Sequence, residues 1–146
     1  MLSVPKFGWT NVKIGDFSAP ASYIRDVGID CLESIIYALE NKRDFCETFD
    51  AEGYEYKIIS DDYRTYIINE QTNPPSLIIN EDMDKHKLAL EIFNDIKDNL
   101  KEWEDFPCFH ISEDENDDWD ETEEFNAYKE DLKNLLTKLE ILIRKE

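Results

Sequence analysis

The densest group of chemically active side chains is the acidic run 113–124, EDENDDWDETEE, in which nine of twelve residues are Asp or Glu. Carboxylates at this density could bind calcium. The EF-hand loop, however, requires Gly at its sixth position and Glu at its twelfth. Counted from Asp114, these positions hold Trp119 and Phe125, so the motif is absent. An irregular calcium site is the alternative, and a calorimetric titration with millimolar calcium would decide it.

Metal ligands and nucleophiles are sparse elsewhere in the chain. Cys108 and His110 lie two residues apart, and neither they nor His86 belong to a second pair with zinc-finger spacing. Nucleophilic catalysis would need a Ser or Cys with a His and an orienting acid, and no motif places such a group. Four glycines form no phosphate-binding loop. We therefore predict no catalytic residue, no metal site and no cofactor.

Trp119 stands out because a large aromatic side chain lies inside the acidic run. Trp is enriched at the energetic centres of protein interfaces, which favours a role as a partner anchor. The simpler alternative is that Trp119 packs back onto the following helix. Our first group of predicted partner contacts is Asp114, Asp117, Asp118 and Trp119.

Two turn signals in the middle of the chain, at residues 50–53 and 60–62, carry a second acidic group. Gly53 suits a tight turn that needs positive φ. The acids beside these turns could simply be solvated turn residues, or they could form an acidic rim that contacts a partner. This second group of predicted contacts is Asp50, Glu52, Asp61 and Asp62.

The net charge limits the possible partners. The chain has 35 acidic and 16 basic residues, which gives −19. Nucleic-acid affinity comes mainly from Lys and Arg on phosphates, so direct binding to DNA or RNA is disfavoured. An anionic membrane surface is disfavoured for the same reason. The bland interpretation is a solvated acidic surface, and the sharper one is a basic protein partner whose encounter is accelerated by opposite charge.

Three cysteines, Cys31, Cys46 and Cys108, make disulfide pairing incomplete. The N-terminus does not resemble a signal peptide, and no apolar run approaches about 18 residues. We expect a cytoplasmic protein whose cysteines are small buried apolar residues.

The elements that must position these side chains can be predicted from apolar spacing. Residues 11–17 alternate as a first strand, and Ala19 to Ser22 indicates a helix start with Ser22 as N-cap. That helix would run to 41–43, with a kink or split at Gly28. The stretch Phe45 to Asn69 is typical of a three-stranded antiparallel meander.

The second half of the chain is mainly helical. Leu77 to Ile79 predicts a short further strand. A stripe from Leu88 to Trp103 predicts a second helix that Pro107 stops, with Trp103 in the core. Acidic blocks such as 113–124 are usually solvated and mobile. Asp120 with Glu123 is predicted to cap a last helix, whose stripe comprises Phe125, Tyr128, Leu132, Leu135, Leu139 and Leu142.

Several short pieces between about residues 11 and 70 carry a resemblance to known proteins. They are Gly15-Asp16-Phe17, Ala21-Ser22-Tyr23-Ile24-Arg25-Asp26, Leu32 to Leu39, Phe49-Asp50 and Glu52-Gly53-Tyr54. Together they resemble a group of small bacterial α+β proteins, and similar proteins occur beside toxin genes as immunity proteins of polymorphic-toxin and contact-dependent inhibition systems. The resemblance implies a binder that neutralises a toxin, and it carries over no functional residue.

Together these patterns predict a single α+β domain over residues 1–146. An antiparallel sheet of four to five strands would have three helices packed mainly on one face, in the order β-α-β-β-β-(β)-α-α. We expect a non-enzymatic acidic immunity protein, monomer or homodimer, that occludes a basic surface of a toxin domain. The alternatives are a structural or regulatory subunit of a complex, and an enzyme with an acidic cleft.

Overall fold

The computed structural model describes residues 1–106 and 118–145, and in 118–122 it describes the backbone alone. It confirms the α+β class and the antiparallel sheet. The strands are β1 (Trp9–Ile14), β2 (Phe17–Ser22), β3 (Phe45–Asp50), β4 (Glu55–Ser60), β5 (Thr65–Asn69) and β6 (Ser76–Asn80). The helices are α1 (Val27–Asn41), α2 (Lys85–Lys97), α3 (Leu100–Glu104) and α4 (Asp118–Arg144).

The main sheet has four antiparallel strands in the order β3-β4-β5-β6. The predicted meander is confirmed, and the stretch around Leu77 to Ile79 does form the fourth strand, β6. The β3–β4 turn places Glu52 at φ 55° and Gly53 at φ 147°. Gly53 therefore supplies the positive φ that the turn requires, as its position in the sequence predicted.

The N-terminal segment differs from the prediction. Residues 17–22 form β2, which pairs antiparallel with β1, and not the start of a helix. Phe17, Ala19 and Ala21 are buried while Ser18 and Pro20 are exposed. Buried and exposed side chains therefore alternate along this strand, and most of them are small. The Ala-Pro-Ala-Ser pattern concealed that period. Pro20 is tolerated because β1 and β2 form a two-stranded sheet in which both strands are edges.

Helix α1 consequently begins later than predicted, at Val27, with Asp26 in the N-cap position instead of Ser22. Gly28 lies in the first turn and neither kinks nor splits the helix. A Cβ at Gly28 would lie 3.1 Å from Trp103 Cε3, so the glycine allows close packing against that indole. The helix ends as predicted, with Lys42 in the left-handed region at φ 51°.

The second predicted helix is divided into α2 and α3, so the described residues contain four helices and not three. Asn99, at φ −125° and ψ 38°, interrupts the helical backbone between them. The break turns Trp103 into the interior, where its exposed fraction is 0% as predicted for a core residue. Helix α4 begins at Asp118, two residues before the predicted cap Asp120.

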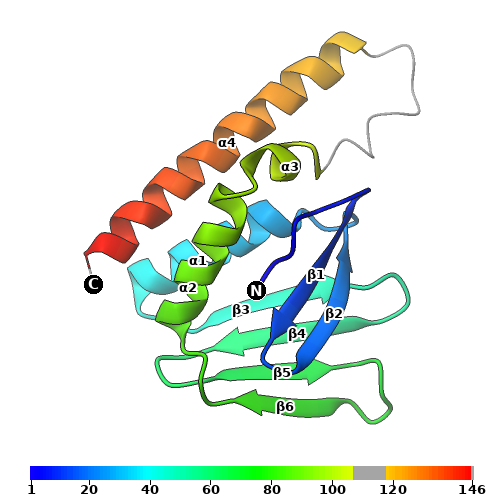
Figure 1. Ribbon diagram of the computed structural model, residues 1–146, viewed down its shortest axis with the longest axis vertical. Helices are drawn as coiled ribbons and strands as arrows, with labels where there is room; N and C mark the ends of the chain where they lie inside the picture. Colours follow the sequence, from blue (N-terminus) through cyan, green and yellow to red (C-terminus); the bar gives the residue numbers. More distant parts are fainter. Residues whose placement is uncertain (107–117, 146) are drawn as a thin grey trace.

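The molecule is layered on one side of the main sheet (Figure 1). The β1–β2 hairpin crosses that side. There Tyr56 Oη on β4 donates to the carbonyl oxygens of Ala19 (3.2 Å) and Pro20 (2.9 Å). Helix α1 packs beside β3, and α4 packs on α1 and α2. The buried side chains Phe45, Phe49, Tyr56, Ile58 and Ile67 face this covered side. The helices thus lie mainly on one face of the sheet, as predicted.

Candidate protein-binding surface

The opposite face of the main sheet is uncovered by the described residues. Side chains alternate between the two faces of a strand. The residues that alternate with the buried set are all half-buried or exposed. The strand register joins them into two rows across all four strands. One row is Cys46, Ile59, Tyr66 and Ile79, and the other is Thr48, Lys57, Ile68 and Leu77.

Six of these eight side chains are apolar or aromatic, although they face solvent, and the second row also contains Thr48 and Lys57. Leu77 is 62% exposed and Ile79 is 47% exposed. Contiguous exposed apolar side chains bordered by polar groups mark protein interaction sites more often than ordinary surface. We call this surface, with its acidic borders described next, the open face.

Carboxylates border the open face at both ends of its strands. At one end Asp50 pairs in register with Glu55, and the Glu70 N–H donates to the Glu55 carbonyl at 3.1 Å. These three acids line a hollow of about 450 Å³ together with Gly53 and Tyr54. Arg25 approaches this hollow, because its Nη2 lies 3.7 Å from Glu55 Oε1.

At the other end the border mixes charges but remains acidic in balance. The Asp61 N–H donates to the Arg64 carbonyl at 3.0 Å, so these two residues face each other across the β4–β5 turn. Arg64 Nη1 lies 3.5 Å from Glu81 Oε1, at the end of β6. Two carboxylates therefore accompany one guanidinium, and the Glu81 side chain is 75% exposed.

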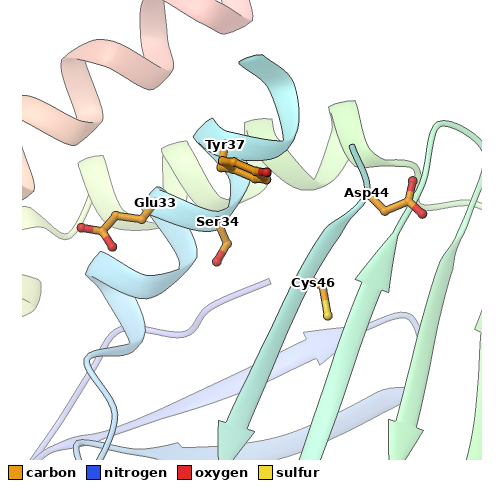
Figure 2. Close-up of a pocket in the computed structure, with 5 residues that line it drawn as sticks. All are labelled: Glu33, Ser34, Tyr37, Asp44 and Cys46. Atoms are coloured by element: carbon orange, nitrogen blue, oxygen red, sulfur yellow. The ribbon is translucent and has the colours of Figure 1, made fainter. Parts of the chain in front are cut away.

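A shallow groove adjoins the open face along β3, which is an edge strand of the main sheet, as β6 is on the opposite side. Figure 2 shows Glu33, Ser34 and Tyr37 projecting from α1, with Asp44 and Cys46 on the opposite wall. The groove encloses about 320 Å³. The Ser34 hydroxyl donates to the Glu47 carboxylate on β3. Cys46 belongs both to this groove and to the first apolar row, so the two surfaces are continuous.

Like charges crowd the α1 side of this groove. Burial is the main reason that the pKa of Asp30 is raised from 3.8 to about 6, and the negative charges of Glu47 and Glu33 raise it further. Arg25 acts in the opposite direction. A Lys or Arg side chain brought here by a partner would relieve this repulsion. Its arrival would favour ionised Asp30.

The second group of predicted contacts is spread over both ends of β4. Asp50 and Glu52 lie at the β3–β4 turn, while Asp61 and Asp62 lie at the β4–β5 turn, so they do not form one rim. Asp50 Oδ1 accepts from the Glu52 N–H at 2.7 Å. The structure instead unites Asp50 with Glu55 and Glu70.

Asp61 and Asp62 have clear structural roles. Asp61 Oδ1 accepts from the Tyr63 and Arg64 N–H groups, each at 2.8 Å, and these bonds lower its pKa. Asp62 Oδ1 lies 3.0 Å from Lys85 Nζ, and Lys85 chiefly lowers the pKa of Asp62. Lys85 is only 4% exposed, so Asp62 helps to hold the start of α2 against the sheet.

The first group of predicted contacts is placed only in part. Asp114 and Asp117 lie outside the described residues. Asp118 and Trp119 begin α4, and their side chains are also outside the described part of the chain. Their role in partner binding stays a prediction.

Sequence reasoning missed Glu55, Glu70 and the apolar rows. A signal was present in the doublets Ile58-Ile59 and Ile67-Ile68. A strand with one buried face should alternate apolar and polar residues, whereas these doublets place an Ile on each face. They indicate that the second face of the sheet is also apolar.

The described residues also show where possible metal ligands and thiols lie. Among residues 1–106 and 118–145, no group of three or more His, Cys, Asp or Glu side chains is arranged to hold a metal. Cys31 is buried, and burial raises the pKa of its thiol. Cys46 is exposed, so the prediction that all the cysteines are buried is wrong for this residue, and Cys108 lies outside the described residues.

Comparison of the chain with models of protein families, with curated proteins and with solved structures finds no significant match. Within the described part of the chain, no helix is both long enough and apolar enough to span a membrane.

Proposed function

We propose that the protein is a non-enzymatic cytoplasmic binding protein, an immunity protein that neutralises a toxin domain by covering a basic surface. The observation that carries this proposal is the open face, where two apolar rows lie between acidic borders. Protein interfaces combine an apolar centre with a polar rim in this way. The excess of negative charge, −19 over the whole chain, selects a basic partner.

The mechanism is steric occlusion guided by charge. Many toxins that act on nucleic acids bind phosphate through Lys and Arg. An acidic surface can imitate that phosphate charge. The carboxylates of Asp50, Glu55 and Glu70 would steer the partner, and burial of the apolar rows would slow its dissociation. Neither step requires a covalent change in the protein.

A paired charge-reversal experiment tests this proposal against a toxin domain encoded by a neighbouring gene. Glu55→Lys/Glu70→Lys alters the acidic border, while Glu102→Lys/Glu130→Lys makes the same charge change at exposed helix positions. At about 0.15 M salt the Debye length is about 8 Å, so only local charges should matter. We expect the border variant alone to lose roughly tenfold in association rate and to protect cells poorly.

Equal behaviour of the two variants would contradict the border's role in binding. Failure of the unaltered protein to bind any toxin domain from the neighbouring genes, or to protect cells from it, would contradict the proposed function itself.

The enzyme alternative has one observation in its favour, the raised pKa of Asp30 near an acidic groove. An acid with a pKa near neutrality could transfer protons. However, the groove is lined by Glu33 and Asp44, and Asp30 is not among its lining residues. Binding is therefore the function that this geometry supports better. Turnover that disappears in Asp30→Asn would reverse that preference.

A further inference from the structure

Within residues 1–106 and 118–145, strand β6 has a hydrogen-bonding edge that no other strand pairs with, and the register of its neighbours defines this edge. The bonds at Asp61–Arg64 and Glu55–Glu70 show that even-numbered residues from 64 to 70 direct their backbone groups toward β4. In an antiparallel ladder the intervening residues point the other way. Residues 65, 67 and 69 therefore bond to β6 at 80, 78 and 76. The N–H and C=O groups of Leu77 and Ile79 point away from the sheet.

Pro74 and Pro75 directly precede β6, but the strand itself carries little that protects this edge. Natural edge strands are usually blunted by Lys, Pro, a bulge or an inward charge. The strand Ser76–Asn80 contains none of these within its five residues, and Ile78 is also 36% exposed. No other described strand pairs with it. Figure 1 shows β6 as the sheet edge farthest from the helices.

The free backbone groups and the open face coincide at the same two residues. Leu77 and Ile79 end the two apolar rows, and their side chains lie on the open face. A strand added beside β6 would extend both rows by one residue. Its side chains on that face would bury the exposed surfaces of Leu77 and Ile79.

We propose that β6 captures an extended segment of the basic partner as a fifth strand of the main sheet. This inference rests on the proposed function and names how the partner is held. Main-chain hydrogen bonds to Leu77 and Ile79 would provide affinity, and alternate apolar side chains would provide specificity. Glu70, which follows β5, and Glu81, which follows β6 and is 75% exposed beside Arg64, favour a segment with Lys or Arg at its ends.

A second copy of the chain fits this edge less well. Antiparallel self-pairing about Ile78 would bring Glu81 of each copy toward the acidic end of the other that carries Glu70. Each copy also carries a net charge of −19, so association would be opposed by repulsion. A basic segment meets the same edge with attraction.

The probe is a nine-residue peptide, Lys-Lys-Val-Thr-Val-Thr-Val-Lys-Lys, added to the full chain and followed by amide NMR. We expect hydrogen exchange at Leu77 and Ile79 to slow at least tenfold. The variant Ile79→Pro removes one outward N–H without touching the β5 ladder, which an edge strand tolerates. It should bind the peptide at least tenfold more weakly, whereas Ile79→Thr, which keeps the N–H, should lose less.

A second variant, Leu77→Lys, covers the case in which Ile79→Pro fails to fold. It keeps every backbone donor and should weaken binding of the peptide, because the new Lys repels the Lys residues of the peptide. Absence of peptide binding would overturn strand capture, as would peptide binding with unchanged exchange at Leu77 and Ile79. A chain that dimerises in sedimentation and loses the dimer in Ile79→Pro would also overturn it, because the occupant would be a second copy.

The toxin-domain experiment separates the two proposals. If the toxin domain binds but Ile79→Pro changes neither affinity nor protection, strand capture fails and the proposed function stands. If the peptide adds to β6 while no toxin domain binds, the edge is confirmed and the immunity function fails.

Discussion

Replacing Asp26 by Asn is expected to stabilise the protein at neutral pH. Asp26 occupies the N-cap position of α1, and its Oδ1 is buried without a hydrogen-bond partner among the described residues. Burial is the main cause that raises its pKa from 3.8 to about 6, and the charges of Asp30 and Glu33 add repulsion, while hydrogen bonds from the Ile29 N–H and from Tyr128 act in the opposite direction. Ionised Asp26 therefore opposes folding.

The size of the effect follows from the two pKa values. Because the folded pKa is the higher one, the folded state binds more protons between about pH 4 and 6, and stability falls as the pH rises through that window. The cost of ionised Asp26 is on the order of 3 kcal/mol at pH 7 and roughly half of that at pH 5. Asn caps helices as well as Asp does, but it gives up a favourable helix-dipole interaction of about 0.3–1 kcal/mol.

The net expectation for Asp26→Asn is a gain of about 2 kcal/mol in unfolding free energy at pH 7, or roughly 6 °C in Tm. The gain should shrink by about 1 kcal/mol at pH 5. Urea denaturation followed by Trp fluorescence at both pH values measures it, with exposed Asp131→Asn as the control, expected within about 0.5 kcal/mol of the unaltered chain. A loss of stability at pH 7, or a gain independent of pH, would refute the electrostatic reasoning.

Two further substitutions test the packing around the main sheet. Lys85→Met keeps the buried stem but leaves the Arg43 carbonyl without the 2.8 Å bond from Lys85 Nζ, and should cost about 1–2 kcal/mol in urea denaturation. The exposed Lys87→Met is its control and should change stability by less than about 0.5 kcal/mol; equal losses would contradict a special role for Lys85. Gly15→Ala should cost about 1–2 kcal/mol, because Gly15 has φ +58° and a Cβ there would collide with Asn80 Nδ2. An unchanged Tm for this variant would show that the hairpin turn is not held against β6.

Several elements were predictable because their signals are local. The β-branched and aromatic residues between Phe45 and Asn69 specify a meander by themselves, and the stripe from Leu88 to Ile96 specifies α2. The strand at 17–22 was missed because small residues carry a weak alternation and Pro20 mimics a helix start. The division at Asn99 was missed because Trp103 continues the helical spacing, although the backbone turns to bury it.

The candidate surface was predictable only in its charge. Asp50 could be named from its turn, but its association with Glu70 depends on two strand pairings between residues distant in the chain. Asp62 was an equally good candidate by sequence, yet its ion pair with Lys85 occupies it within the fold. Spacing along a chain does not reveal which acids a fold uses internally.

The amino-acid sequence by itself determined the α+β class, most strands and helices, and the strongly negative charge, because periodicity, turn chemistry and composition act over a few residues. Only the tertiary structure decided which face of the sheet is covered. That choice depends on where the β1–β2 hairpin and the helices pack, and hence on long-range contacts such as the one between Tyr56 and Ala19. The same contacts leave Ile79 and its row, and the adjoining edge of β6, uncovered by the described residues.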